Sequence, residues 1–576
     1  MKRVGSFLGD WWRLVVPYFR SEERWIAISL LVGAVVLTLS SVAVEVAYNE
    51  WSRRFFDTFQ NKDEAGFWHE MGNFVWIAGL AIFFAVARGL VSPYLRLRWR
   101  RWLTGRYLAH WLDSRGYYRI ELERRIDNAD QRISEDLNSL GLYTMQLVLG
   151  LIGAVATLVS FLFILWTLSG TLSLAAIGID AHVPGYMVWV ALVYAFAGTW
   201  FANLVGRRLI PLNFAQQALE ADFRFSLVRV RENAEGIALY QGEPAEQENL
   251  VARFQAVFMN GWRVLFTSLQ LAVYQTGYAQ IAIIFPYLVT GPRFFEGAIT
   301  LGVMTQTAQA FGQVQTALSF FIDNYATVAE LRAVMDRLIG LRSSIDHRQD
   351  TAIDVAPEAG RTDVAALDLT LGLPNGQALL KDATMVLPRG KSTLITGASG
   401  SGKSTLFRAL AGIWPFGHGQ VRVPAGARVL FLPQKPYIPI GTLRNAVKYP
   451  DEGSRASDSE IVAALEAARL GHLAGRLDDT AHWSYVLSGG EQQRLAIARA
   501  LVFKPDWLFL DEATASLDEA SEAAVYGELK KRLPSTTIVS IGHRPTLRQW
   551  HDRQVELKRA PGEVGSLVEA GVSSAP

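Results

Sequence analysis

Residues 397–404, with the sequence GASGSGKS, constrain the fold of this chain more than any other feature. They have the spacing of a phosphate-binding loop, Gly-x-x-x-x-Gly-Lys-Ser, between a strand-like apolar run, 392–396, and a helix-like run, 406–410. Glycine lets the backbone turn its N–H groups toward an anion, and the N-terminus of the following helix carries a partial positive charge. A chance glycine-rich turn is the alternative, but it requires neither the strand nor the helix. The pattern therefore predicts an α/β domain that binds a nucleotide.

The residues of this loop have separate expected roles. Lys403 is expected to reach the β- and γ-phosphates of ATP, and Ser404 is expected to ligate Mg²⁺. The predicted ATP contacts in this segment are Gly397, Ala398, Ser399, Gly400, Ser401, Gly402, Lys403, Ser404 and Thr405.

Length and composition indicate what surrounds the nucleotide. A chain of 576 residues is long enough for two or more cores. It is 50% hydrophobic and contains 17 Trp, which is too apolar for a wholly soluble enzyme and favours membrane spans. The net charge of +2 gives no reason to expect a nucleic-acid partner. With no cysteine, the chain has no disulfide framework, thiolate metal site or catalytic thiol.

Six apolar runs are long enough to cross a bilayer, and they predict a polytopic α-helical membrane domain in contact with lipid. The first 24 residues mix arginine with tryptophan and leucine, which predicts an amphipathic helix on the membrane surface. A cleaved signal peptide is the alternative, but no small-residue cleavage site is obvious. The predicted spans are 25–48, 71–94, 144–168, 184–206, 267–291 and 298–322.

Basic residues predict the orientation of these spans. Arginine is dense between residues 96 and 132, whereas 169–184 contain no Lys or Arg. Because cytoplasmic connections carry the excess of basic residues, the first segment is expected in the cytoplasm and the second outside. An even number of spans then leaves both termini and the ATPase domain in the cytoplasm.

The pattern changes after the last span. A charged helical run gives way to a polar stretch, and from about residue 363 short apolar runs alternate with helical ones, as in an α/β domain. The expected organisation is a transmembrane domain over 1–340, a linker over 341–362 and an ATP-binding domain over 363–576.

Polar residues at the ends of apolar strands predict the catalytic chemistry. Asp511 is placed to hold Mg²⁺ through water, and Glu512 to orient and deprotonate the attacking water. Gln434 can touch the metal shell, and His543 can donate a hydrogen bond to the γ-phosphate. Each residue alone fits an ordinary strand end or loop, but their order and spacing favour the catalytic assignment. The predicted catalytic residues are Glu512, His543 and Gln434, and the predicted metal ligands are Ser404, Gln434 and Asp511.

A second glycine turn, LSGGEQQR at 487–494, opens a helix and is specific to ABC-type ATPases. With it, residues 363–557 resemble the nucleotide-binding domain of ABC transporters. The resemblance implies that two such domains close face to face, each ATP lying between the phosphate loop of one and this turn of the other. One chain has one of each, so a homodimer is the simplest expectation. The residues expected to contact the partner's nucleotide are Ser488, Gly489, Gly490, Glu491 and Gln492.

One position departs from the family pattern. The family usually stacks an aromatic ring on adenine, shortly before a Pro-x-Gly turn, some twenty residues upstream of the phosphate loop. Here that position is Leu373, followed by Pro374, Asn375 and Gly376. We therefore expect adenine to pack on aliphatic surface, or base selectivity to be weak.

Four stretches narrow the resemblance: 49–63, 126–137, 232–246 and 431–450. They resemble the group that contains peroxisomal fatty-acyl half-transporters and the bacterial BacA-like and YddA-like proteins. For the first three stretches, charged solvated connecting helices are the alternative. The resemblance implies an ATP-driven half-transporter of the exporter-type fold in a bacterial inner membrane.

Polar residues within the spans bear on the cargo. Gln306, Gln309 and Gln313 share one helical face of the sixth span, and Tyr274 and Tyr278 share one of the fifth. Such faces line a wet cavity or bond to each other, and the pattern leaves both open. A wet cavity favours a peptide-like or other bulky hydrophilic solute over the alternative, a fatty-acyl or lipid cargo. A soluble ATPase acting on DNA or ribosomes and an ATP-gated channel are further alternatives, and the six spans disfavour the first.

Overall fold

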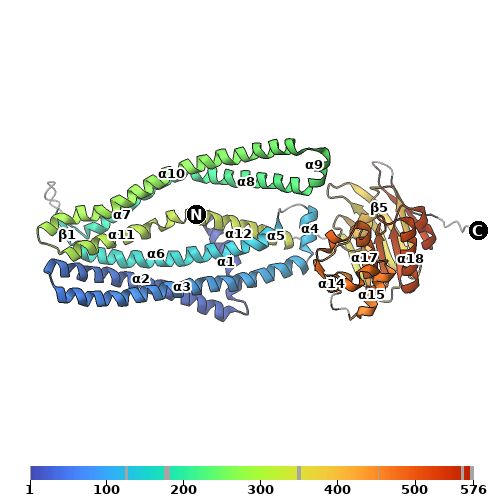
Figure 1. The fold of residues 1–576 in the computed structure, drawn as a ribbon, viewed down its shortest axis with the longest axis horizontal. Coiled ribbons are helices and arrows are strands. Elements are labelled where there is room, and N and C mark those ends of the chain that lie inside the picture. The colour runs from blue at the N-terminus through green and yellow to red at the C-terminus, as the bar shows by residue number, and fades with distance from the viewer. Residues whose placement is uncertain are drawn as a thin grey trace, which may run out of the picture. The chain divides into compact units, whose positions relative to one another are not determined.

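The computed structural model describes residues 2–113, 115–123, 128–173, 182–346, 352–451, 453, 455–559 and 563–570. The chain forms two compact units, Met1–Asp346 and His347–Pro576. The first is built of helices, and the second of helices around two β-sheets (Figure 1).

Each of the six predicted spans overlaps one helix of the first unit: α2, α3, α6, α7, α10 or α11. By length and composition, the described segments Arg24–Asn61, Glu64–Asp113 and Ala129–Ser169 can cross a membrane, and Tyr186–Ala202 is a shorter apolar helix. A short ribbon of β1 (Thr171–Ser173) and β2 (His182–Pro184) precedes α7. The helices are α1 (Lys2–Phe19), α2 (Arg24–Asn61), α3 (Glu64–Asp113), α4 (Gly116–Glu123), α5 (Ala129–Gln131), the π-helical turn η1 (Arg132–Asp136), α6 (Leu137–Ser169), α7 (Tyr186–Gly206), α8 (Leu209–Glu232), α9 (Ala234–Tyr240), α10 (Glu243–Phe295), α11 (Leu301–Asp323) and α12 (Tyr325–Asp346).

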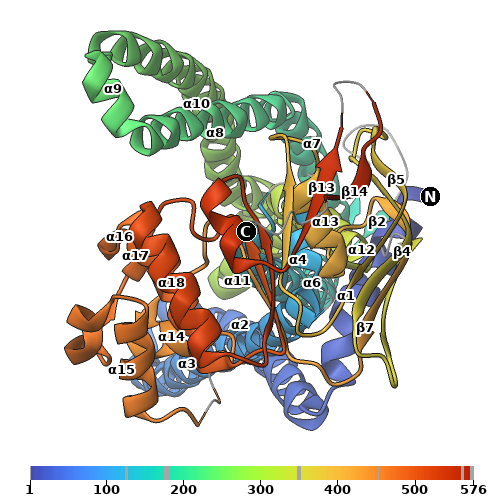
Figure 2. The ribbon, with the colours of Figure 1, turned by 90° about the vertical axis from the view of Figure 1, so that its right-hand side faces the viewer.

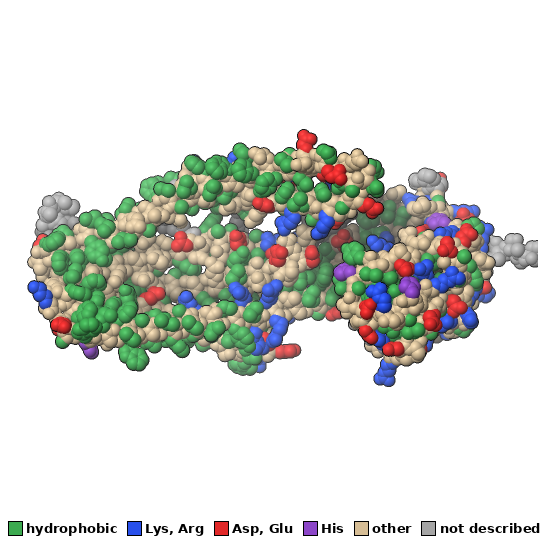
Figure 3. All heavy atoms as spheres, in the orientation of Figure 1, with side chains coloured by type: hydrophobic (Ala, Val, Ile, Leu, Met, Phe, Trp, Pro, Cys, Tyr) green, Lys and Arg blue, Asp and Glu red, His purple; other side chains and the backbone are tan. Residues whose placement is uncertain are grey.

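Several of these helices are much longer than a span. The 50 residues of α3 and the 53 of α10 extend for roughly 75 and 80 Å, whereas the hydrocarbon core of a bilayer is about 30 Å thick. The arginines at 96–106, predicted to lie in a connecting segment, therefore continue α3 as the same helix. Hydrophobic side chains cover the outward surfaces of these helices (Figure 3).

The amphipathic N-terminal helix, α1, packs on the other helices of its unit. Tyr18 is fully buried and stacks on Trp99 of α3, with 6.0 Å between ring centroids. Just after α1, Glu23 accepts hydrogen bonds from Arg98 at 3.1 Å and Arg101 at 2.7 Å. Trp12 remains 58% exposed. One apolar face of α1 thus covers protein core, and its place at a membrane surface stays a prediction.

The stretch predicted as a linker, 341–362, contains the boundary between the two units, and its residues 347–351 lie outside the described residues. Helix α12 continues to Asp346 because Leu341 and Ile345 are buried against neighbouring helices. In the second unit, β3 (Ala352–Glu358) buries Ile353 and pairs with β7 (Gly417–Pro424). Polar residues on the opposite faces of these two elements gave the segment its linker-like composition.

The main sheet of the second unit has six strands in the order β14-β13-β6-β12-β11-β8, parallel except for β14. The antiparallel pair β13 and β14 lies at one edge of the sheet (Figure 2). Its central strand β12 is buried throughout, which accounts for its continuous apolar run. Because the carboxyl ends of parallel strands meet at one edge, the loops that follow β6, β8, β11 and β12 converge there. The strands are β6 (Thr393–Gly397), β8 (Val429–Leu432), β11 (Trp507–Asp511), β12 (Thr537–Ile541), β13 (Arg553–Lys558) and β14 (Ser566–Ala570).

A second sheet has the order β3-β7-β4-β5, with β4 (Val364–Gly372) antiparallel to β5 (Ala378–Leu387) and to β7. Two short strands, β9 (Gly441–Thr442) and β10 (Thr480–Ala481), form a separate ribbon. The helices of this unit are α13 (Lys403–Leu410), α14 (Leu443–Lys448), α15 (Asp458–Ala467), η3 (Gly471–Arg476), α16 (Trp483–Val486), α17 (Gly489–Phe503), α18 (Glu519–Arg532) and η4 (Pro545–Trp550).

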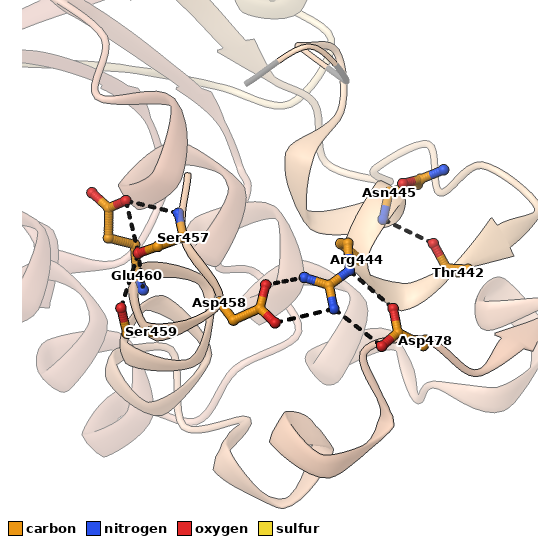
Figure 4. A network of polar contacts seen from close by, with 8 residues as sticks. All are labelled: Thr442, Arg444, Asn445, Ser457, Asp458, Ser459, Glu460 and Asp478. Atoms are coloured by element: carbon orange, nitrogen blue, oxygen red, sulfur yellow. Dashed lines mark hydrogen bonds and ion pairs between the residues drawn. The ribbon is translucent and has the colours of Figure 1, made fainter. Parts of the chain in front are cut away.

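Polar contacts join α14 to its neighbours in this helical region (Figure 4). The Arg444 guanidinium donates to Asp458 at the start of α15 and to Asp478 at 3.0 Å. Thr442 caps α14 by accepting from the backbone N–H of Asn445. The charged cluster fixes α14 and α15 relative to each other on the outside of a large apolar core.

Candidate functional site

The phosphate loop connects β6 to α13 and has glycine where the backbone needs it. Gly397, Gly400 and Gly402 have φ values of 150°, 76° and 109°. A Cβ atom at Gly397 would lie 2.5 Å from the carbonyl oxygen of Leu557 in β13. The loop therefore packs directly on the next strand, which only glycine permits at this position.

Lys403 and Ser404, the first residues of α13, lie at the centre of the site. The ammonium group of Lys403 donates to the carbonyl oxygens of Gly397 at 2.9 Å and Ala398 at 2.8 Å. Lys403 is only 5% exposed. Burial lowers the pKa of Lys403, and the nearby carboxylates of Glu512 and Asp511 oppose that change. A cation is thus held within the loop.

Asp511 ends β11 and accepts a hydrogen bond from the Ser404 hydroxyl at 3.0 Å. Burial raises the pKa of Asp511, and the neighbouring Glu512 charge raises it further. A hydroxyl and a carboxylate beside a phosphate-binding loop are hard oxygen ligands of the kind Mg²⁺ takes together with phosphate and water. Among the described residues, no group of three or more His, Cys, Asp or Glu side chains forms a separate metal site. The Ser404 and Asp511 pair therefore fits the predicted metal.

Glu512 is fixed from both sides. Its backbone has a φ of 48°, and its N–H donates to the Ile541 carbonyl of β12 at 3.1 Å. One carboxylate oxygen accepts from the Gln434 amide at 3.1 Å, and the other lies 3.1 Å from Nε2 of His543. The structure thus brings together the three predicted catalytic side chains, from the ends of β8, β11 and β12. A left-handed backbone is uncommon for a residue with a side chain such as Glu512.

The LSGGEQ turn begins α17. The Ser488 hydroxyl caps the helix by accepting from the Glu491 N–H, and the Glu491 carboxylate accepts from the Ser488 N–H at 2.9 Å. These hydrogen bonds lower the pKa of Glu491. The Gln492 amide donates to the carbonyl oxygens of Ser484 and Leu487 at 2.8 and 2.9 Å. Glu491 and Gln492 thus shape their own turn, and a nucleotide contact from this turn stays a prediction.

Two residues that the sequence did not single out connect these loops. Gln493 is 3% exposed; it donates to the Gln434 carbonyl at 3.0 Å and accepts from the Ser516 N–H at 2.9 Å. Arg544, next to His543, donates to the carbonyl oxygens of Leu517 and Ala515 at 2.6 and 3.1 Å. The one feature of the sequence that could have singled out Gln493 and Arg544 is that they directly follow Gln492 and His543. Their partners are backbone atoms of other loops, which a single sequence does not identify.

The expected adenine end is a tight turn after β4. The Leu373 N–H donates to the Gln377 carbonyl at 2.8 Å, and the Gly376 N–H donates to the Leu373 carbonyl at 2.9 Å. Trp414 donates to the Gly372 carbonyl at 2.9 Å but is only 5% exposed. Its ring belongs to the core rather than to a surface on which a base can stack.

In the first unit, two of the predicted cavity residues instead connect helices. The Gln306 amide donates to Glu50 of α2 at 3.0 Å, and the Gln309 amide donates to Ser52 of α2 at 2.9 Å. Both amides thus make the interhelical hydrogen bonds that were the alternative to cavity lining, while the buried Oε1 of Gln306 has no hydrogen-bond partner among the described residues. A cavity role for these two residues stays a prediction. Gln313 is half-buried on the same helix and is outside the cavity lining described next.

The predicted tyrosines of α10 do line a cavity. It has a volume of about 300 Å³ and lies between α7, α10 and α11. The Tyr274 hydroxyl also donates to the Gly198 carbonyl at 2.8 Å, and the Tyr278 hydroxyl to the Tyr194 carbonyl at 3.1 Å. The lining residues are Gly198, Ala202, Tyr274, Gln275, Tyr278, Ala279, Gln315, Thr316, Ser319 and Asp323.

Comparison with known proteins places both units. Residues 12–295 match the family model described as ABC transporter transmembrane region 2, and residues 380–515 match the family model described as ABC transporter. The chain is 38% identical to an uncharacterized ABC transporter ATP-binding protein of Haemophilus influenzae, covering 95% of this chain and 92% of the relative. It is 31% identical to the inner membrane ABC transporter ATP-binding protein YddA of Escherichia coli, over 92% and 94% of the two chains. It is 27% identical to the human lysosomal cobalamin transporter ABCD4, over 95% and 93%.

A solved structure shows the same fold. A bacterial Atm1-family ABC exporter with ATP bound superposes with a TM-score of 0.74 over 92% of this chain and 93% of that chain, at 20% sequence identity. This confirms the predicted fold class, in which a helical transmembrane region is fused to an α/β ATPase domain.

Proposed function

Because this chain belongs to the ABC transporter family, we propose that it uses ATP to move a bulky hydrophilic, peptide-like solute across a bacterial inner membrane as a homodimer. The family and the coupling of an ATPase to transport follow from the matches over both units. The chain has the half-transporter architecture of the exporter kind. The cargo, the homodimer and the membrane are our proposals. The main support for a hydrophilic cargo is the polar lining of the cavity between α7, α10 and α11.

The second unit supplies the residues for ATP hydrolysis. Glu512 accepts a proton from a water molecule, the water oxygen bonds to the γ-phosphorus, and the bond to the oxygen bridging to ADP breaks. Gln434 and His543 hold the two oxygens of the Glu512 carboxylate in place. Mg²⁺, when bound by Ser404 and Asp511, neutralises charge on the phosphates.

The occurrence of two different anion-binding turns in one chain supports the proposed homodimer. A chain carries one phosphate loop and one LSGGEQ turn. Ser488 caps α17 and leaves the N–H groups of Gly489 and Gly490 at the helix N-terminus. We infer that they bind the γ-phosphate held by the second copy, so that ATP binding draws the two ATPase units together and hydrolysis releases them.

Two features favour a hydrophilic cargo over a fatty-acyl one. The described lining offers side-chain hydroxyl, amide and carboxylate groups from α10 and α11, and such groups are costly to hold against an acyl chain. A relative named as a cobalamin transporter acts on a molecule that is bulky and hydrophilic. The inner membrane is inferred from the relative YddA, whose name places it there.

Reconstitution tests the proposal. The full chain in proteoliposomes is supplied with ATP on one known side, and the accumulation of a labelled hydrophilic peptide is compared with that of a labelled acyl-CoA. We expect ATP-dependent movement of the peptide, abolished by Glu512→Gln. Movement of the acyl-CoA alone would replace the cargo with the lipid alternative, and the side of accumulation gives the direction. ATP-dependent leak without accumulation would indicate a channel.

A further inference from the structure

The cavity between α7, α10 and α11 has a wall of stacked tyrosine rings. Tyr194 of α7 and Tyr278 of α10 stack with centroids 4.5 Å apart and planes 16° apart. Tyr274 lies one helical turn before Tyr278, with ring planes 17° apart and centroids 6.1 Å apart. Tyr274 and Tyr278 line the cavity, and Tyr194, which packs on Tyr278, is outside the described lining. The negative face of an aromatic ring attracts cations.

The tyrosine wall is fixed rather than adaptable. All three hydroxyls donate to backbone carbonyls of the facing helix, at 2.6, 2.8 and 3.1 Å. A Cβ atom at Gly198 would lie 2.2 Å from the Tyr278 ring, so the rings approach the α7 backbone as closely as glycine allows. Since each hydroxyl has used its proton, its oxygen can only accept a further hydrogen bond from a ligand.

The other side of the cavity carries a carboxylate. Asp323, the last residue of α11, is exposed, and no described residue forms an ion pair or hydrogen bond with its side chain. The described lining contains this one carboxylate and no Lys or Arg. Asp323 directly follows the predicted sixth span, 298–322, and it lies on the lining of the cavity. Its charge is therefore available to a ligand.

We propose that this cavity binds the cationic group of the transported solute, a guanidinium or ammonium group. Asp323 neutralises its charge, and the rings of Tyr274 and Tyr278 cover its face. Gln275 and Gln315 belong to the same lining, and their side-chain amide oxygens can accept its remaining N–H groups. The inference rests on the proposed function because the cavity is taken to lie on the transport path, and it narrows the cargo to cations.

The proposal is tested by binding without ATP. The full chain in lipid nanodiscs is titrated against a fluorescently labelled peptide containing three arginines. A second peptide has citrulline at the same positions, which keeps the size and most hydrogen bonds but removes the charge. Fluorescence anisotropy gives both dissociation constants. We expect the arginine peptide to bind the native chain about tenfold more tightly, the range of one charge-assisted contact.

Substitutions test which side chains of the cavity bind the arginine peptide. Asp323→Asn should weaken binding of the arginine peptide about tenfold and leave the citrulline peptide unchanged. Asp323→Glu should keep most of the affinity, which excludes misfolding as the cause. Tyr274→Leu should weaken it about threefold and Tyr274→Phe should not, since phenylalanine keeps the ring. Glu248→Gln, an exposed carboxylate on α10 outside the lining, is the matched control.

The outcomes separate the two proposals. Equal affinities of the native chain for the two peptides, no binding of either, or an unchanged Asp323→Asn variant would each overturn the cation site. Charge-dependent binding without ATP-driven accumulation in proteoliposomes would keep the site and remove the transport proposal. Accumulation of the citrulline peptide as fast as the arginine peptide would keep transport and remove the cation site.

Discussion

The ATP site and the membrane cavity are both built from polar residues on several elements, but they depend on sequence differently. In the ATP site, each residue ends or follows a parallel strand, so the sheet itself brings Lys403, Asp511 and His543 to one edge. In the membrane unit, α11 is polar on two faces, one bonded to α2 and one lining the cavity. A local motif therefore suffices to locate the first site, whereas the second requires knowing which helix covers which face.

The largest expected effect is on ATP hydrolysis, and it tests the ATP site. Glu512→Gln keeps the size and the hydrogen-bonding capacity of the side chain but removes the base, so ATPase turnover should fall by about a hundredfold or more. ATP binding, measured by equilibrium titration of the purified chain, should persist. Glu519→Gln, seven residues on and exposed at the start of α18, is the control and should turn over ATP normally. Near-normal ATPase activity of Glu512→Gln would remove the assignment of the general base.

The same difference between local motifs and long-range contacts explains which features of each unit could be predicted from the sequence. Spans and strand ends are encoded by runs of neighbouring residues, and so the six helices and the carboxylates of β11 were predictable. Gln493 and Arg544 were not, because they bind backbone carbonyl or N–H groups of distant loops. The burial of Ile345 and Ile353 at the two ends of the predicted linker was also not predictable, because polar surface residues surround them in the sequence.

A glycine pair in the first unit tests whether the cavity wall depends on close packing. Gly198→Val should destabilise the fold by about 1–3 kcal/mol, since its side chain would have to displace the stacked Tyr278 ring. Gly277→Val on α10 has no heavy atom within 4 Å of the added Cβ and serves as the control. Thermal unfolding in nanodiscs measures both. Equal melting temperatures for the two variants would show that the tyrosine wall is mobile.

In the second unit, a buried histidine tests how much the ATPase fold depends on packing outside its motifs. His551 lies 2.8 Å from the Ser540 hydroxyl and 2.8 Å from the Leu547 carbonyl, and burial lowers its pKa to about 4. Since its unfolded pKa is higher, near 6.5, its stabilising contribution is complete above that pH and is lost as the pH falls toward 4. The ATPase unit should lose about 2 kcal/mol of stability between pH 7.5 and pH 5 from this group.

The pH dependence of thermal unfolding measures this loss. His551→Gln should be less stable at pH 7.5 but should show a shallower dependence on pH. If the stability of His551→Gln depended on pH as steeply as that of the native chain, other groups would be responsible for the loss of stability at low pH.

The smallest expected effect separates the two polar faces of α11. Gln309→Leu removes a hydrogen bond to Ser52 of α2 and should lower stability by about 1 kcal/mol with little change in peptide accumulation. Gln315→Leu, on the cavity lining, should reduce accumulation of the arginine peptide about threefold with little change in melting temperature. Each variant is the other's control, because both replace glutamine by leucine within two turns of the same helix. If Gln309→Leu impaired accumulation and Gln315→Leu did not, the transport path would lie along α2, and the cavity between α7, α10 and α11 would be a packing defect.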